Sequence, residues 1–384
     1  MMATFPIDIL KEAETPLYYY DLDLLRATLA SLKSACDKHP DYHVHYAMKA
    51  NANVALLTEI REAGLGIDAV SGGEIRRALD AGFAPSDIVF AGVGKNDKEI
   101  RLALAEGIGC FNVESEPELE VIASLAAEAG VRAKVALRVN PNIDAHTHAY
   151  ITTGLSENKF GISREQLDGM ISRCLEFSSI ELYGLHFHIG SQITETGPFE
   201  MLSDTINELQ DYYEARGITF RSINVGGGLG IDYEDPDRHP IPDFSSYFDT
   251  FASHLRLREG QELHFELGRS IVAQCGSLIT RVLYVKKGLV KNFVIVDAGM
   301  TDLIRPALYQ AHHKIENITA PECSSEKTYD VVGPICESSD CFGTDEKLPV
   351  THRGDLLALR SAGAYGEIMA SQYNCRKLPG SMAR

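Results

Sequence analysis

Short apolar runs alternate with helix-like, amphipathic stretches between Tyr42 and Glu266. Runs of this kind indicate strands buried on both faces, separated by helices. Eight β–α alternations over about 225 residues match a (β/α)₈ TIM barrel in number and size. A doubly wound open sheet is the alternative, although it usually has fewer strands. The predicted strands are His43–Met48, Leu65–Val70, Ile88–Ala91, Gly109–Val113, Val135–Val139, Leu182–His188, Ser222–Val225 and Leu263–Glu266.

The clearest helix signal lies between two of these strands. Ser115-Glu116-Pro117-Glu118 reads as a capping box that opens a helix through Ala129. Amphipathic spacing also predicts helices over Thr205–Arg216 and Phe244–Leu255. An earlier helix, Asp23–Cys36, would lead into the first barrel strand.

The pattern changes after Gly268, where strand-like runs are separated by turn-rich loops without a long helix. This texture predicts a second, all-β domain of sandwich or barrel-like form. The early strand Pro16–Tyr20 is expected to join it. We therefore predict an N-terminal strand region at 1–22, the barrel at 23–266 and the β domain at 267–384. The predicted strands after the barrel are Leu278–Val285, Asn292–Val296, Tyr329–Val332, Asp355–Leu359 and Gln372–Leu378; Tyr233–Pro242 is predicted to be a surface loop.

Composition excludes several classes of function. The net charge of −18, from 36 basic and 54 acidic residues, argues against sequence-independent binding to nucleic acid or to anionic lipid. No apolar run approaches the length of a membrane span, and no secretory signal is visible at the N-terminus. The eight cysteines are scattered without a CxxC pair, so a disulfide framework or a zinc site is not expected. We expect a reducing cytoplasm.

Lys49 closes the first predicted barrel strand, which is a costly place for an ammonium group. Desolvation lowers the pKa of a lysine and makes its amine nucleophilic, as in a Schiff-base lysine. The alternative is that Lys49 extends its charge out of the strand end into water.

Other unusual residues fall at the ends of later strands, and the C-terminal ends of strands are where barrels place their chemistry. His188 ends the sixth strand, the glycine run Gly226–Gly230 follows the seventh, and Glu266 ends the eighth. The glycines lack the GxGxxG spacing of a dinucleotide site. They suit an anion site, because bare backbone amides can approach an anion closely. The alternative is that they form only a tight turn. His188 could pack on an aromatic ligand or be a hydrogen-bonded core residue. Histidine spacing fits no metal motif, so no metal is expected.

Glu266 completes a chemical pattern with Lys49 and the glycine run. A carboxylate at that position would keep a pyridine nitrogen protonated, so that the ring becomes an electron sink. Together these groups indicate a pocket for pyridoxal 5′-phosphate (PLP). The alternative for Glu266 is a salt bridge to Arg138 or Arg269.

The motifs resemble those of the fold-type III PLP-dependent decarboxylases, which act on ornithine, arginine and diaminopimelate. Tyr46–Asn51 resembles the cofactor-lysine motif, and Val70–Glu74 resembles the next signature. His186–Gln192 is similar to the motif whose second histidine stacks on the cofactor ring. Glu266–Arg269 resembles Glu-Pro-Gly-Arg, with leucine in place of proline. The resemblance covers nearly the whole chain and is closest to the diaminopimelate decarboxylases.

The resemblance implies a role for each matching residue. The catalytic residues would be Lys49, Cys336, His188 and Glu266. The cofactor would be held by Lys49, His188, Ser191, Gly227, Gly228, Glu266, Gly268, Arg269 and Tyr365. The substrate would be bound by Arg269, Arg305, Tyr309, Glu337 and Tyr365. The segment Gly333–Asp340 resembles a Cys-Glu-Ser loop that, in relatives, enters the active site of the other subunit, which implies a homodimer with shared sites.

The implied activity is the decarboxylation of meso-2,6-diaminopimelate to L-lysine and CO₂, the last step of lysine biosynthesis. Arg305 and Tyr309 suit a substrate with a second carboxylate. Cys336 or a nearby acid would protonate the carbanion that decarboxylation leaves, unless Cys336 is an inert buried thiol. Alternatives are a decarboxylase for arginine, ornithine or carboxynorspermidine, a racemase, or a non-catalytic binding protein. Racemases pair the pyridine nitrogen with arginine. The acid at Glu266 therefore argues against a racemase. Asn142–Lys159 is predicted to be a lid.

Overall fold

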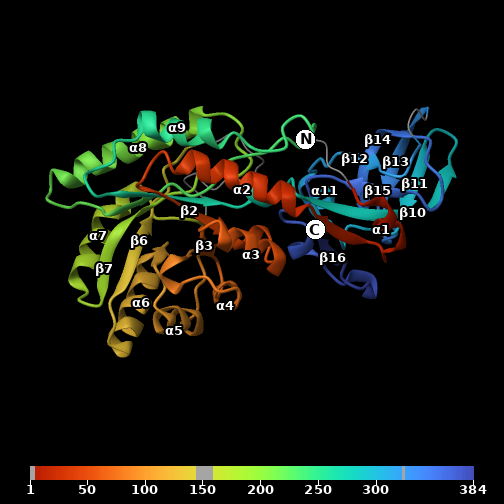
Figure 1. Cartoon of the computed structure of the whole chain (residues 1–384). Helices are drawn as coiled ribbons and strands as arrows, with labels where there is room; N and C mark the ends of the chain where they lie inside the picture. Colours follow the sequence, from red (N-terminus) through yellow and green to blue (C-terminus); the bar gives the residue numbers. More distant parts are fainter. Residues whose placement is uncertain (1–4, 144–158, 322–324) are drawn as a thin grey trace. The chain divides into compact units, whose positions relative to one another are not determined.

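The computed structural model describes residues 5–143, 159–321 and 325–384 of the chain (Figure 1). Contacts within the chain define two compact units. The barrel unit contains Leu29–Gly230 and Asp243–Gly268, and the β unit contains Met1–Thr28, Ile231–Pro242 and Arg269–Arg384. The predicted surface loop after the seventh barrel strand therefore groups with the β unit. The two units are defined by contacts between residues and need not be separate domains. The domain boundaries predicted after residues 22 and 266 therefore stay predictions.

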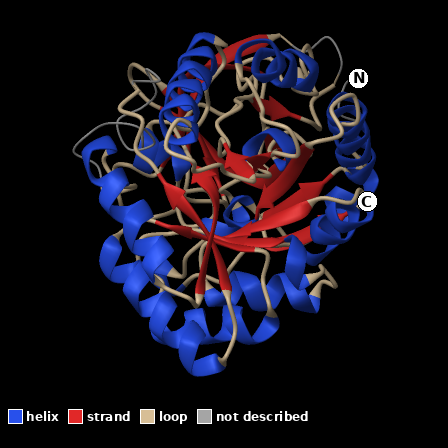
Figure 2. Cartoon of the chain, turned by 90° about the vertical axis from the view of Figure 1, so that its left-hand side faces the viewer, coloured by secondary structure: helices blue, strands red, loops and turns tan. Residues whose placement is uncertain are grey.

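Eight parallel strands close into a barrel, and helices surround them (Figure 2). The ring closes where β2 pairs with β9, from Tyr42 opposite Leu263 to Tyr46 opposite Leu267. Each predicted barrel strand overlaps an observed one, so the barrel prediction is confirmed and the open-sheet alternative is wrong. The strands are β2 (Tyr42–Ala47), β3 (Gly66–Ala69), β4 (Ile88–Phe90), β5 (Cys110–Val113), β6 (Ala133–Arg138), β7 (Ile180–His186), β8 (Ser222–Asn224) and β9 (Glu262–Leu267).

Several helices begin at a side chain that caps their first turn. Asn53, Ser71 and Asp243 each accept a hydrogen bond from a backbone N–H of the helix that follows. Within the part of the chain that the structure describes, none of the helices has the length and apolar character that a membrane crossing requires. The helices are α2 (Leu22–Cys36), α3 (Val54–Glu62), α4 (Gly72–Asp80), α5 (Asp97–Glu106), α6 (Glu116–Ala129), α7 (Leu167–Glu176), α8 (Gly197–Glu214) and α9 (Phe244–His254).

Ser115 caps α6 as predicted, but the second half of the capping box does not form. The Ser115 hydroxyl accepts a hydrogen bond from Glu118 N at 3.4 Å. The Glu118 carboxylate accepts its own bonds from Glu114 N at 2.8 Å and from Lys95 Nζ at 2.6 Å. Because a buried ammonium is costly to leave unpaired, Lys95 takes the acid that the local pattern assigns to the cap.

The β unit is built on an eight-stranded sheet with the path β12-β15-β10-β11-β13-β14. β1 pairs antiparallel with β10 and parallel with β16, which confirms that Pro16–Tyr20 joins the β domain. The strands are β1 (Leu17–Tyr20), β10 (Gly276–Lys287), β11 (Asn292–Val296), β12 (Ile315–Asn317), β13 (Glu326–Val332), β14 (Cys341–Pro349), β15 (Leu356–Leu359) and β16 (Gly380–Ala383). The helices are α1 (Ile7–Glu12), α10 (Arg269–Val272) and α11 (Arg305–Tyr309).

The β unit differs from the prediction in several places, and the short strands β12 and β16 are among the elements that were not predicted. Gln372–Leu378 is not a strand: it holds a 3₁₀ turn at Tyr373–Cys375, and β16 follows it. Asn374 has φ +55° and Cys375 has φ +57°, and this left-handed conformation interrupts an extended chain. Strand β14 was not predicted, because it lies at the end of the sheet path and carries charged residues in place of alternating apolar ones.

Histidines gather at the N-terminal ends of the barrel strands, around a cavity of about 710 Å³. His45 Nε2 lies 2.9 Å from His264 Nδ1, and His45 Nδ1 lies 3.3 Å from the Asp87 carbonyl oxygen. The ring of His43 stacks on that of His264 at 5.1 Å. Burial, and then the charge of His264, lowers the pKa of His45 to about 3 against the opposing charge of Glu266. His45 is therefore neutral in the folded protein near pH 7.

We expect the barrel to lose stability as the pH falls from 6.5, the ordinary pKa of histidine, toward 3, in part through His45. In that window the unfolded chain binds a proton at His45 that the folded chain does not. One such proton costs about 1.4 kcal/mol of unfolding free energy per pH unit. His45→Gln should flatten the slope of the urea-unfolding free energy against pH by about one proton. His352→Gln, at an exposed histidine, serves as the control; an unchanged slope in His45→Gln would contradict the assignment.

Candidate active site

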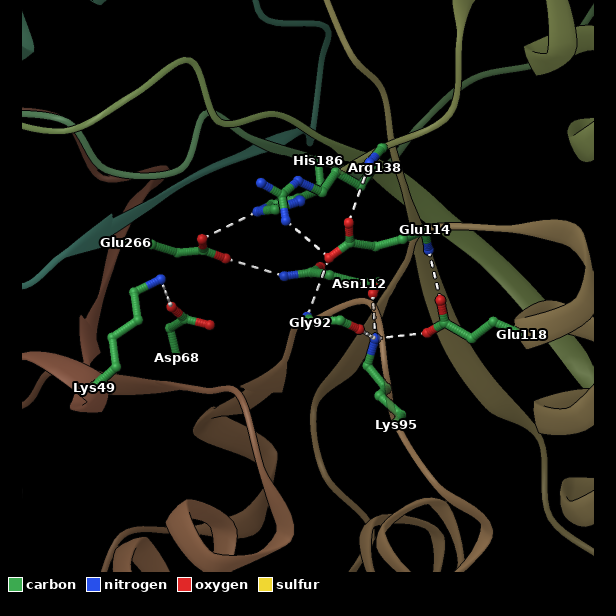
Figure 3. Close-up of polar contacts among 11 residues, drawn as sticks. Lys49, Asp68, Gly92, Lys95, Asn112, Glu114, Glu118, Arg138, His186 and Glu266 are labelled. Atoms are coloured by element: carbon green, nitrogen blue, oxygen red, sulfur yellow. Dashed lines mark hydrogen bonds and ion pairs between the residues drawn. The ribbon is translucent and has the colours of Figure 1, made fainter. Parts of the chain in front are cut away.

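Lys49 lies at the C-terminal end of β2, on the 3₁₀ turn Met48–Ala50. Its side chain is 42% exposed, so it is less desolvated than the sequence argument assumes. The Nζ atom lies 3.8 Å from Asp68 Oδ2 at the end of β3 (Figure 3). A Cβ atom at Gly268 would stand 3.1 Å from the Cβ atoms of Ala47 and Ala50, so this glycine lets the chain pack closely against the lysine turn.

Asp68 is a site residue that the sequence reading missed. Its side chain is fully buried, and neither carboxyl oxygen has a hydrogen-bond partner among the described residues. Burial, and then the charge of Glu266, raises the pKa of Asp68 to about 8, although Lys49 opposes this shift. The carboxyl is therefore mostly protonated at neutral pH. An acid inside the apolar run Leu65–Val70 was the available signal.

Glu266, at the end of β9, is held by donors from three other strands, and Figure 3 shows two of these donors, Asn112 and His186. Its Oε1 accepts hydrogen bonds from Asn112 Nδ2 at 3.0 Å and Asn224 Nδ2 at 2.9 Å. Its Oε2 lies 3.0 Å from His186 Nε2. Burial alone would raise the pKa of Glu266, but the charge and hydrogen bond of His186 outweigh it and lower the pKa. Glu266 is therefore an anion in a pocket of fixed donors.

A buried ion network supports Asn112 from the side opposite Glu266 (Figure 3). Lys95 Nζ donates to the Asn112 carbonyl at 2.7 Å and to Glu118 at 2.6 Å. Arg138 Nη1 donates to Glu114 Oε1 at 2.8 Å, so the predicted alternative of an Arg138–Glu266 salt bridge is not the contact that forms. The network holds the C-terminal ends of strands β5 and β6 in place around Glu266. The predicted lid, Asn142–Lys159, falls mostly on 144–158, outside the described residues.

The glycine run turns the chain tightly at the mouth of the barrel. Gly226 has φ +71° and Gly228 has φ +125°, and a Cβ atom at Gly227 would stand 2.2 Å from the Glu266 carbonyl oxygen. Only glycine fits this path. The Gly228 carbonyl accepts a hydrogen bond from Ile193 N at 2.8 Å, which brings the loop carrying Ser191 beside the run.

His188 borders the same loop and is partly exposed. Its Nδ1 accepts a hydrogen bond from Gly227 N at 3.2 Å. Burial, and then the positive charge of Lys49, lowers the pKa of His188 well below the usual value. The imidazole is therefore neutral, and its orientation is set by the glycine run.

The β unit contains a second cluster, in which two arginines meet one phenol. Arg269 Nη1 donates to the Tyr233 hydroxyl at 2.6 Å, and Arg305 Nη1 donates to the same oxygen at 3.0 Å. The Arg269 guanidinium lies 5.0 Å from the centre of the Tyr365 ring. Tyr309 ends the short helix α11 that Arg305 begins. Tyr233 was not predicted as a site residue, since its loop was read as surface.

Cys336 and Glu337 lie in the loop between β13 and β14, and both are exposed. Tyr373 OH donates to Glu337 Oε1 at 2.7 Å, and Cys336 N donates to Asn374 Oδ1 at 3.4 Å. The buried Asp340 accepts a hydrogen bond from Ile335 N at 2.6 Å and so holds the base of the loop.

The structure thus gathers the predicted site residues in three groups. The barrel group is Lys49, His188, Ser191, Gly227, Gly228, Glu266 and Gly268. The β-unit group is Arg269, Arg305, Tyr309 and Tyr365, and the loop group is Cys336 and Glu337. Sequence reasoning missed Asp68, Tyr233 and the three donors to Glu266.

Comparisons with known proteins point to one family. The family described as "Pyridoxal-dependent decarboxylase, pyridoxal binding domain" matches residues 24–273. The diaminopimelate decarboxylase of Bacteroides thetaiotaomicron is 62% identical over 379 residues, which is 99% of this chain and 98% of that protein. The diaminopimelate decarboxylase of Vibrio cholerae is 45% identical over 372 residues, 96% of this chain and 87% of that protein. The structure of Helicobacter pylori diaminopimelate decarboxylase complexed with L-lysine is similar with a TM-score of 0.92 and 42% identity, over 98% of this chain and 93% of that one.

Proposed function

The chain belongs to the pyridoxal-dependent decarboxylases, and from this membership we propose that it converts meso-2,6-diaminopimelate to L-lysine and CO₂ with PLP as cofactor. The relatives that it matches over almost its full length are diaminopimelate decarboxylases. The observation that carries the substrate assignment is the convergence of Arg269 and Arg305 on one point of the β unit. A second carboxylate distinguishes diaminopimelate from ornithine, arginine and lysine, and paired guanidinium groups suit it.

The polar groups of the barrel unit fit PLP. When bound, PLP supplies a protonated pyridine ring that accepts the electrons of the bond broken at the substrate's α-carbon. A carboxylate has about four acceptor sites, and Glu266 uses three of them on Asn112, Asn224 and His186, so one is left for a pyridinium N–H. The bare backbone of the glycine run allows the close approach that a phosphate needs.

The barrel residues then have separate tasks. Lys49 would hold the cofactor through its amine, which reaches the open mouth of the barrel beside the protonated Asp68. Glu266, anionic at neutral pH, would stabilise the positive charge of the ring nitrogen. The neutral ring of His188 would cover one face of the cofactor. Backbone and side-chain donors for the cofactor and its phosphate would be Ser191, Gly227, Gly228, Gly268, Arg269 and Tyr365.

The remaining residues would bind the substrate and protonate the carbon that has lost CO₂. Arg269, Arg305, Tyr309 and Tyr365 would bind the distal carboxylate, because the two guanidinium groups present their donors at one point. Glu337 would bind the distal ammonium, and Cys336 would return a proton to the α-carbon. A racemase is disfavoured because the acid at Glu266 strengthens the electron sink that decarboxylation requires.

We also propose a homodimer in which the loop carrying Cys336 and Glu337 completes the site of the partner subunit. Two observations support this: both residues are exposed, and Asp340 and Tyr373 hold their loop in a defined shape. The proposal includes a reducing compartment such as the cytoplasm, since the role given to Cys336 needs a free thiol.

A substrate panel tests the function. The PLP-loaded protein should release CO₂ from meso-diaminopimelate with kcat/KM at least about 10³-fold above the values for arginine, ornithine and carboxynorspermidine. Arg305→Ala should raise KM for diaminopimelate by about 10²-fold with little change in kcat, since it removes charged hydrogen bonds to the distal carboxylate. Arg353→Ala, at an exposed arginine of the β unit, is the matched control. No turnover of diaminopimelate would refute the function, and an unchanged KM in Arg305→Ala would refute the carboxylate assignment.

A further inference from the structure

Two arginines of the β unit, Arg269 and Arg305, both donate to one acceptor, the hydroxyl of Tyr233. Arg269 and Arg305 are each 6% exposed, and both donate through Nη1, at 2.6 Å and 3.0 Å. The Arg305 guanidinium also lies 5.0 Å from the centre of the Tyr233 ring. Tyr233 therefore determines where the two charges meet.

This arrangement brings two buried positive charges together at the Tyr233 hydroxyl. Among the described residues, no carboxylate forms an ion pair with Arg305, and two buried like charges repel each other. Burial would raise the pKa of Tyr233, but the charges of Arg269 and Arg305 outweigh it and lower the pKa. The phenol oxygen is thus a strong acceptor that offsets part of the repulsion.

His313 holds Arg305 from the other side. Its Nδ1 lies 2.8 Å from the Arg360 carbonyl oxygen, to which it can only donate, so Nε2 is left as the acceptor for Arg305 Nη1 at 2.9 Å. Burial, and then the charge of Arg305, lowers the pKa of His313 to about 3, so the imidazole stays neutral. The ring also packs edge-on against Tyr233 at 5.3 Å.

Ion pairs connect the segment that carries Tyr233 to the sheet of the β unit. Arg360, directly after β15, pairs with Asp237 at 3.1 Å and with Glu316 of β12 at 2.8 Å. Lys314 pairs with the same two acids, at 3.3 Å and 3.0 Å. Asp237 lies four residues after Tyr233 in the segment Ile231–Pro242, so these bonds hold the segment that carries the phenol.

We propose that Tyr233 and His313 are positioning residues that aim Arg269 and Arg305 at one carboxylate, and that they thereby set the preference for substrates with a second carboxylate. The inference rests on the proposed function, in which these arginines bind the distal carboxylate of diaminopimelate. Neither residue needs to touch the reacting carbon, so their removal affects recognition and not the chemical step.

Tyr233→Phe removes the shared acceptor and keeps the ring. The variant should raise KM for meso-diaminopimelate by about 10- to 30-fold, the effect of losing a hydrogen bond to a charged group, with kcat within about 2-fold. D-lysine keeps the reacting centre but lacks the second carboxylate, so its kcat/KM should not change. Tyr212→Phe removes a hydroxyl that bonds Asp168 on the barrel unit, and should behave as wild type.

His313→Phe tests the second positioning contact, and His313→Gln is its rescue. The phenylalanine removes the acceptor for Arg305 and should raise KM for diaminopimelate by about 10-fold. The glutamine amide offers both a donor and an acceptor and should recover most of the loss. His312→Gln, at the neighbouring half-exposed histidine that pairs with Glu234, is the matched control. A purely structural role would lower kcat/KM for D-lysine as well, and would overturn the proposal.

Pimelate provides a readout that does not depend on turnover, since it has both carboxylates of diaminopimelate and neither amine. Its inhibition constant should rise in Tyr233→Phe and His313→Phe by the same factor as KM. If wild type turns over diaminopimelate and binds pimelate but both variants match wild type, the inference is wrong and the proposed function stands. If wild type does neither, the proposed function and the inference fail together.

Discussion

Replacing Lys49 by alanine is expected to lower the turnover of meso-diaminopimelate by at least about 10³-fold, the largest effect of any single change in this chain. Lys49 supplies the amine at the mouth of the barrel, where its side chain is 42% exposed and lies 3.8 Å from the buried Asp68. Exogenous amines cannot restore the full rate, because the fixed position of the amine is itself part of the rate enhancement.

Borohydride reduction of the PLP-loaded protein, followed by peptide mass mapping, gives a direct chemical readout. Wild type should carry the reduced cofactor on Lys49, and Lys49→Ala should carry none. Lys98→Ala, at an exposed lysine, is the control and should be labelled as wild type. A label on another lysine of the wild-type protein would rule out Lys49 as the anchor.

Glu266→Gln is expected to lower kcat by about 10²- to 10³-fold with a smaller change in KM, since in the proposed mechanism it removes the charge that would face the electron-accepting ring. The substitution also places amide hydrogens opposite Asn112, Asn224 and His186, which are arranged to donate to an acid. The carboxylate is anionic in the folded protein because His186 lowers its pKa against the effect of burial.

A matched control for this change lies on the same strand. Glu262 begins β9, is 41% exposed, and accepts a hydrogen bond from Tyr183 at 2.9 Å. Glu262→Gln should leave kcat for diaminopimelate within about 2-fold of wild type, because it lies at the N-terminal end of the barrel. Equal losses in both variants would mean that Glu266 acts through the stability of β9 and not through its charge.

Much of the fold could be read from local pattern. Each barrel strand is a short apolar run, and β–α alternation leaves few architectures. The prediction failed where local pattern carries no information. At Asn374 and Cys375 the chain takes positive φ without glycine, and β14 is a charged strand stabilised by its pairing with β13.

Some residues of the candidate site could likewise be found from local pattern, and others could not. Lys49, Glu266 and the glycine run could be found because a charge at the end of an apolar run, or several glycines together, is unusual in the sequence itself. Asp68 was inside a predicted strand but needed its surroundings to be recognised. Tyr233 sits in a polar loop that reads as surface, and only its contacts with the arginines reveal a role.

By itself, the sequence determined that the chain forms a barrel and a β domain, and it placed each barrel strand to within a few residues. Only the tertiary structure decided what the side chains of the site meet. Glu266 takes its donors from β5, β7 and β8, which barrel closure brings together across more than forty residues of sequence. Burial, charge and hydrogen bonding in such a pocket depend on neighbours distant in the chain, and these neighbours set the pKa values and the aim of the arginines.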